Sequence, residues 1–142
     1  MSNPLKRVAT FFYGSFIRPD IMSLAGFEPS TIEVAKLSGY DICFDPHANV
    51  FRSGQQCVYG ILVYPSHDQL EKLYRRDGVG TFLPEAVLVE TRDNRFLPAL
   101  CFMPPGRNQV PPDRQYIELI AAAARQHGFP AEYLSRLEAL LR

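Results

Sequence analysis

The sequence predicts an α+β fold that forms a single domain over residues 1–142. Strand-like segments fill most of the first two thirds of the chain, and two amphipathic helical segments follow near its end. A chain of this length can bury a sizeable core without disulfides or a structural metal. Apolar residues make up 46% of the chain and aromatic residues 12%, which excludes a disordered protein.

The first predicted strand covers residues 8–13, where β-branched and aromatic residues follow one another without polar alternation. Pro19 then opens a short helix that Gly26 closes. A second strand region covers residues 30–44 and ends before Pro46, because a proline nitrogen cannot donate to a sheet.

The clearest strand covers residues 55–64 and carries bulky side chains on both faces, so we expect it inside the fold. Ser66 and Gln69 have the spacing of a capping box at the start of the next helix. We expect this helix to end at Gly78.

Residues 84–90 and 96–102 predict a β-hairpin joined by a polar turn. The proline-rich stretch 103–112 predicts a connecting loop. Two helices should follow, the first over about residues 113–127 and the second beginning at Pro130.

The 15 Lys and Arg residues balance 15 Asp and Glu residues, so the charge does not indicate nucleic acid or a membrane surface as a partner. A small neutral or zwitterionic ligand fits this balance better. The cysteines Cys43, Cys57 and Cys101 lack close pairing, which indicates reduced thiols. With a polar start and no segment typical of a signal peptide or membrane helix, we expect a cytoplasmic protein. The three histidines lie in separate segments, so no metal site is expected.

The segment Tyr13-Gly14-Ser15-Phe16, after the first predicted strand, is the first candidate site. Glycine allows a tight turn that leaves peptide N–H groups unpaired, and converging N–H groups bind a carboxylate or an oxyanion. A plain surface turn explains the same residues. Ser15 lacks the flanking glycines of a nucleophile elbow, so we do not expect covalent catalysis.

Taken in order, these segments resemble the gamma-glutamylcyclotransferase-like (AIG2-like) family over nearly the whole chain. Residues 13–16 are similar to the family's Tyr-Gly-Ser-Asn/Thr-Leu loop, and residues 58–64 to its central strand. Residues 70–79 resemble its helix that ends in Glu-Gly-Val, and residues 112–116 and 122–133 resemble its closing helices.

The resemblance implies a small mixed β-barrel with flanking helices. It also implies an enzyme, without a cofactor, that acts on a small molecule with a gamma-glutamyl or related amide group and releases 5-oxoproline. In that reaction the α-amine of the substrate attacks its own γ-carbonyl. The protein must therefore accept a proton and stabilise a tetrahedral oxyanion.

Asp77 falls at the position of the family's proton-accepting glutamate, and residues 13–16 at the substrate-binding loop. Aspartate withdraws the carboxylate by one methylene, and a misplacement of about 1 Å can cost about a hundredfold in rate. Phe16 replaces a polar loop residue, and Phe82 stands near a position where many members have tyrosine. These differences predict a less polar pocket and a divergent substrate. Asp77-Gly78 is also a common helix-ending turn.

Glu85 is the substitute carboxylate, because it lies on the strand after Asp77. Apolar residues occupy both faces of this strand, so the pattern does not decide which face is buried. We expect the Glu85 side chain to point outward, with an inward direction as the alternative. Arg52 either binds a substrate carboxylate from the loop before the interior strand or is an exposed loop arginine. Two other functions stay open: a related proton-transfer, cyclisation or lyase reaction on a specialised metabolite, and a catalytically silent domain that binds a small molecule or a protein.

Overall fold

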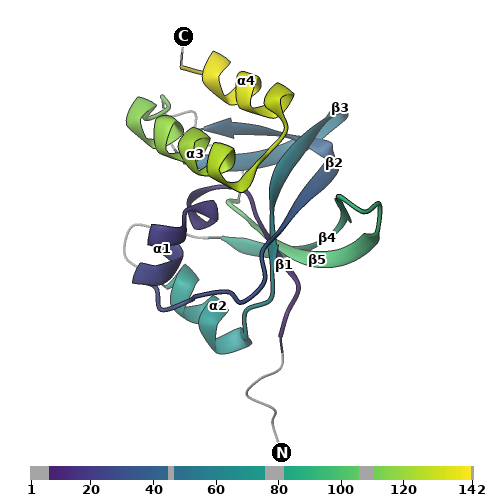
Figure 1. Cartoon of the computed structure of the whole chain (residues 1–142), viewed down its shortest axis with the longest axis vertical. Helices are drawn as coiled ribbons and strands as arrows, with labels where there is room; N and C mark the ends of the chain where they lie inside the picture. Colours follow the sequence, from purple (N-terminus) through teal and green to yellow (C-terminus); the bar gives the residue numbers. More distant parts are fainter. Residues whose placement is uncertain (1–6, 45–46, 76–81, 106–110, 142) are drawn as a thin grey trace, which may run out of the picture.

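The computed structural model describes residues 7–44, 47–75, 82–105 and 111–141 (Figure 1). Its centre is a closed barrel with the strand order β1-β3-β2-β4-β5. Neighbouring strands pair antiparallel except for β1 and β5, which are parallel. The mixed barrel implied by the family resemblance is therefore confirmed. The strands are β1 (Thr10–Phe12), β2 (Glu33–Phe44), β3 (Ala48–Val63), β4 (Leu83–Thr91) and β5 (Phe96–Met103).

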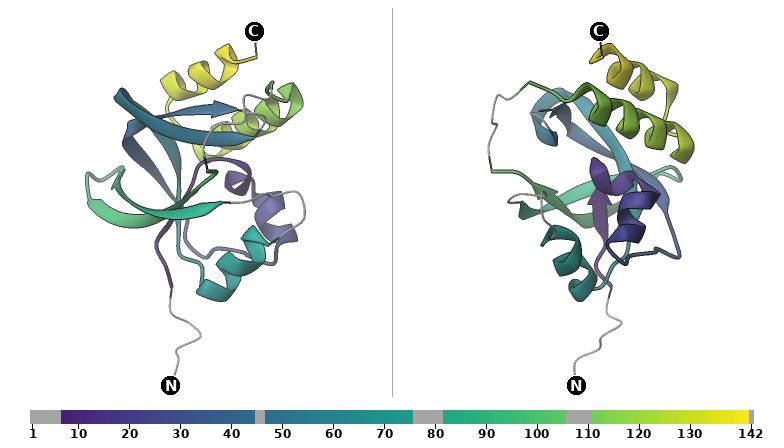
Figure 2. Two further views of the ribbon diagram at one scale, coloured as in Figure 1. Left: turned by 180° about the vertical axis from the view of Figure 1, so that it is seen from behind. Right: turned by 90° about the vertical axis from the view of Figure 1, so that its left-hand side faces the viewer.

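Helices flank the barrel in two groups (Figures 1 and 2). One group lies toward the end of the molecule where the chain enters and the other over the far part of the β2–β3 hairpin. The 3-10 turn η1, which follows β1, lies between them. The elements near the chain entry are α1 (Pro19–Leu24) and α2 (His67–Tyr74), those over the hairpin are α3 (Arg114–His127) and α4 (Ala131–Ala139), and η1 covers Ser15–Ile17.

The helix ends follow the local sequence signals. Ser66 Oγ accepts a hydrogen bond from Gln69 N at 3.2 Å, and Gln69 Oε1 accepts one from Ser66 N at 2.9 Å, so the predicted capping box is confirmed. Asp113 caps α3 through Gln115 N at 3.0 Å. Gly128 ends α3 in the left-handed conformation with φ 80°, which favours glycine. Gly78, the predicted end of α2, lies outside the described residues.

Strand β3 is longer than the sequence predicts, because it begins at Ala48 rather than near residue 55. Its polar first half pairs with β2 beyond a bulge at Gly39, whose φ is 86°. In this register Arg52 lies opposite Tyr40. The expectation that Arg52 belongs to a loop is therefore wrong: the polar, glycine-containing sequence around it forms the outer part of a long hairpin.

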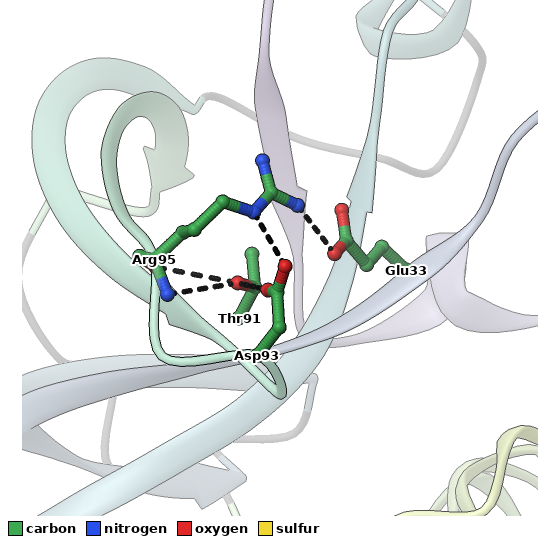
Figure 3. A network of polar contacts seen from close by, with 4 residues as sticks. All are labelled: Glu33, Thr91, Asp93 and Arg95. Carbon is green, nitrogen blue, oxygen red and sulfur yellow. Dashed lines mark hydrogen bonds and ion pairs between the residues drawn. The ribbon is translucent and has the colours of Figure 1, made fainter.

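The barrel closes between β2 and β4 through two register pairs, Ala35–Thr91 and Lys36–Glu90. The turn between β4 and β5 reinforces this closure (Figure 3). Arg95 donates from Nε to Asp93 Oδ2 at 2.8 Å and from Nη2 to Glu33 Oε2 on β2 at 2.9 Å. Buried Thr91 donates to the same aspartate. The network therefore fixes the hairpin that carries Glu85 to the rest of the barrel.

Gly60 allows β1 to lie close to β3. A methyl group at this position would lie 2.2 Å from the carbonyl oxygen of Phe12 and 2.7 Å from the ring of Phe11. Both phenylalanines are almost fully buried, so neither has room to move. The close approach places the end of β1, and the loop that follows it, at a fixed depth in the barrel.

No helix in the described parts of the chain combines the length and the hydrophobicity needed to cross a bilayer.

Candidate functional site

The loop after β1 forms a single 3-10 turn. Ile17 N donates to Gly14 O at 3.0 Å, and Arg18 N donates to Ser15 O at 3.0 Å. The first N–H groups of a helical turn have no acceptor inside the turn. The N–H groups of Ser15 and Phe16 are the first of this turn, so they have no acceptor inside it. An anion-binding loop requires such N–H donors. Substrate binding by this loop stays a prediction.

Tyr116 of α3 holds this loop against the start of β3. Its hydroxyl shares a hydrogen bond of 2.9 Å with Ser15 Oγ and accepts a second from Ala48 N at 3.3 Å. Burial raises the pKa of Tyr116, although the bonds with Ser15 and Ala48 oppose this effect. A Cβ atom at Gly14 would lie 2.8 Å from Ala48 Cβ and 3.4 Å from the Tyr116 hydroxyl. The loop is therefore packed tightly between two elements that are distant in sequence.

The sequence gives no signal for this contact of Tyr116. Its position on a helical pattern predicts packing against the core, and its partner Ser15 lies 101 residues earlier in the chain. Tyr116 is thus a site residue that sequence reasoning missed.

Tyr13 uses its side chain to connect β1 with β5. Its hydroxyl donates to Phe102 O at 2.9 Å, and the side chain is buried. Burial, with a smaller effect of the neighbouring Cys101, raises the pKa of Tyr13 far above its usual value. The hydroxyl therefore stays protonated and occupied as a donor, and the placement of the loop depends on it.

Four rings form an aromatic cluster beside the loop: Phe16, Tyr74, Phe82 and Phe102. The rings of Phe16 and Tyr74 meet edge to face with centroids 5.0 Å apart. Tyr74 stacks on Phe102 at 4.2 Å and contacts Phe82 at 5.6 Å. Burial raises the pKa of Tyr74 well above its usual value. The side of the loop that faces this cluster is thus apolar, as the change to Phe16 predicts.

Asp77 lies in the segment 76–81, outside the described residues. Two residues that flank this segment in sequence belong to the aromatic cluster: Tyr74 before it and Phe82 after it. Tyr74 contacts both Phe16 of the candidate loop and Phe82. The position of Asp77 relative to the loop stays a prediction.

Glu85 lies on the inward-facing side of β4. It stands opposite Cys101, which is fully buried, and it shares its alternation with the buried residues Val87 and Val89. Leu88, on the other alternation, is 59% exposed. Glu85 itself is exposed, in agreement with the expectation of a solvated side chain. A role for Glu85 inside the barrel stays a prediction.

Glu85 also affects the Cys101 thiol, its partner across the β4–β5 pair. Burial first, and then the charge of Glu85, raises the pKa of the Cys101 thiol to about 12. The thiol is thus neutral and unreactive at physiological pH.

Arg52 is exposed on the β2–β3 hairpin, and its guanidinium lies over the Tyr40 ring at 5.5 Å from the centroid. This contact is with its strand partner, and a role for Arg52 in substrate binding stays a prediction. Among the residues that the structure describes, no three His, Cys, Asp or Glu side chains come together as metal ligands.

Comparison with known proteins gives one family. Gamma-glutamylcyclotransferase from Bos taurus is 25% identical over 144 residues, a match that covers 92% of this chain and 77% of that protein. The protein of the same name from Homo sapiens is 24% identical with the same coverage. A solved structure of gamma-glutamyl cyclotransferase has a TM-score of 0.79 at 22% identity, over 94% of this chain and 87% of that one, which shows the shared fold. The sequence model of the AIG2-like family matches residues 57–137, more than half of the chain, and the chain belongs to this family.

Proposed function

We propose that this protein is an enzyme that converts a gamma-glutamyl amine or amide to 5-oxoproline and the free amine. Its membership of the AIG2-like family and its similarity to proteins named gamma-glutamylcyclotransferase support this reaction class. The differences at Phe16, Asp77 and Phe82 support a substrate that diverges from that of the relatives.

One structural observation carries the proposal. Phe16 of the loop, Tyr74 before the segment that contains Asp77 and Phe82 after it meet in a single aromatic cluster. The described residues on either side of the segment that contains Asp77 therefore belong to the same cluster as Phe16, which supports Asp77 as the candidate base. Glu85, the alternative base, shares its alternation on β4 with buried Val87 and Val89, and its own side chain is exposed.

The proposed reaction needs a donor set and a proton acceptor. The substrate α-nitrogen attacks the γ-carbonyl carbon and forms the new C–N bond of the five-membered ring. The loop N–H groups of Ser15 and Phe16 stabilise the oxyanion, and a carboxylate takes the proton of the attacking amine. The intermediate then collapses, the original amide C–N bond breaks, and the proton passes to the departing amine. We assign the proton acceptor to Asp77, with Glu85 as the alternative.

The aromatic cluster favours a substrate whose amine part is apolar. Phe82 and Phe102 are half-buried, so part of each ring remains accessible beside the loop. Each buried methylene of a ligand contributes about 0.8 kcal/mol. We therefore expect gamma-glutamyl amines with aliphatic or aromatic groups to react faster than those with polar groups.

The experiment is release of 5-oxoproline from a panel of gamma-glutamyl amino acids and amines by the wild-type chain, Asp77→Asn and Glu85→Gln. We expect Asp77→Asn to lower the rate at least a hundredfold and Glu85→Gln to leave it within about threefold. Asp68→Asn and Glu118→Gln are matched controls, because both carboxylates are exposed on helices outside the site.

The outcomes separate the candidate functions. Loss of 5-oxoproline release only in Glu85→Gln would identify Glu85 of β4 as the proton acceptor. An unchanged rate in both variants contradicts a carboxylate base. Binding of the panel without release supports a catalytically silent domain, and conversion to a product other than 5-oxoproline supports a different cyclisation or lyase reaction.

A further inference from the structure

A hollow of about 190 Å³ shares no lining residue with the candidate loop or the aromatic cluster. Its lining comes from Arg7 before β1, the segment that joins α1 to β2, the residue after β3 and the first turn of α2. The polar residues that line it are Arg7, Glu28, Ser30, Thr31, Tyr64 and Gln69. None of them belongs to the candidate site described above. The volume corresponds to about six water molecules, which suits a ligand of amino-acid size.

The cationic side of this hollow is held in place by α2. Arg7 Nη1 donates to Gln69 Oε1 at 2.8 Å, and that same oxygen accepts from Ser66 N at 2.9 Å. The backbone is also fixed, because Arg7 forms a bridge with Ser66 and Val8 N donates to Pro65 O at 2.8 Å. A guanidinium has five N–H donors, so binding Gln69 leaves donors for a carboxylate.

The anionic side comes from the segment after α1. Ser23 Oγ donates to Glu28 Oε1 at 3.2 Å, which orients the carboxylate and leaves lone pairs on both oxygens. Phe27, next to it, is buried with its N–H bonded to Met22 O at 2.9 Å, so the segment is anchored to α1. The hydroxyl groups of Ser30 and Thr31 add polar donors and acceptors on the same segment.

Among the residues that the structure describes, the charged ones in the lining of this hollow are Arg7 and Glu28, and their signs are opposite. An anion would be attracted by Arg7 and repelled by Glu28. A cation would be attracted by Glu28 and repelled by Arg7. A ligand with both charges a few ångströms apart gains from both. We propose that this hollow binds a free α-amino acid, with its carboxylate on Arg7 and its ammonium group on Glu28.

The test is a titration of the full-length ¹⁵N-labelled chain with L-alanine and L-glutamine, followed by amide chemical shifts. We expect saturable shifts at Thr31, Tyr64 and Gln69 with a Kd of about 1 mM. Arg7→Gln and Glu28→Gln should each weaken binding at least tenfold. Arg75→Gln and Glu118→Gln, at exposed positions outside the hollow, should leave the Kd unchanged.

Blocked ligands test the two charges separately. N-acetyl-L-alanine lacks the ammonium group and L-alaninamide lacks the carboxylate, so both should bind at least tenfold more weakly than L-alanine. Equal binding of either compound overturns the proposal, as does the absence of saturable shifts. Amide shifts at Ser15 and Phe16, without shifts at the residues of the hollow, also overturn the proposal. They would indicate that the amino acid binds at the candidate loop. Because no turnover is measured, the result is independent of the proposed enzyme activity.

Discussion

Replacement of Gly14 by alanine should displace the candidate loop without unfolding the barrel. The added methyl group would lie 2.8 Å from Ala48 Cβ. Two carbon atoms in contact prefer a separation of about 3.5–4.0 Å, so one of the two chains must move by about 1 Å. Ala48 is held by its pairing with Phe44 of β2 and by the hydrogen bond from its N–H to the Tyr116 hydroxyl, and we therefore expect the loop to move.

A shift of this size changes both the hydrogen bonding and the chemistry of the loop. The 2.9 Å bond between Ser15 and Tyr116 weakens steeply when its atoms separate. A misplacement of about 1 Å in a catalytic group costs about a hundredfold in rate. Gly14→Ala should therefore lower kcat/KM for 5-oxoproline release about a hundredfold. The amide shifts of Ser15 and Phe16 report the displacement separately from turnover.

Two further variants make this prediction refutable. Gly54→Ala is the matched control, because a methyl group there meets nothing within 4 Å. The double variant Gly14→Ala with Ala48→Gly removes the clashing methyl group and should restore most of the activity. The reasoning fails if Gly14→Ala retains activity within about threefold of the wild type, or if Ala48→Gly gives no recovery.

Three other predictions concern stability and positioning. Gly60→Ala should lower the free energy of unfolding in urea by about 3 kcal/mol, because its methyl group would lie 2.2 Å from a carbonyl oxygen of β1. The control Gly54→Ala, also on β3, should leave the free energy of unfolding unchanged. Tyr116→Phe should cost about 1 kcal/mol and lower kcat more than it changes KM, and an unchanged kcat would refute the positioning role. Hydrogen bonds from Thr91 and then from Arg95 lower the pKa of Asp93, so its contribution to stability is complete above pH 4 or so and is lost as the pH falls through that lowered pKa. Asp93→Asn should be less stable than the wild type at pH 7, with the difference disappearing as the pH falls below the lowered pKa of Asp93.

The elements that the sequence predicts well depend on neighbouring residues. The capping box of α2 uses two residues three positions apart, and the β4–β5 hairpin needs a turn between two apolar runs. The left-handed end of α3 needs one glycine at the correct position. Such signals involve residues that are close together in sequence, so they can be recognised in a single sequence.

The features that the sequence does not reveal depend on distant contacts. The polar stretch around Arg52 has the composition of a loop, but pairing with β2 across a bulge makes it a strand. The contact of Tyr116 with Ser15 joins α3 to the loop after β1, and no spacing rule connects them. The face of Glu85 was ambiguous because burial on β4 is decided by the rest of the barrel, which covers Val89 and leaves Leu88 exposed.

The titration behaviour of the barrel interior limits the choice of proton acceptor. Burial raises the pKa values of Tyr13, Tyr74 and Tyr116, so these hydroxyls stay protonated at neutral pH. The thiol of Cys101, with a pKa of about 12, is neutral as well. All four groups can donate or shape the pocket, but none can accept a proton from an attacking amine near pH 7. These four groups are therefore not the base, and the proposal of a carboxylate base predicts rates that fall when the pH drops toward the usual carboxyl pKa of about 4. Activity that appears only above pH 9 would instead indicate a tyrosine or a thiol.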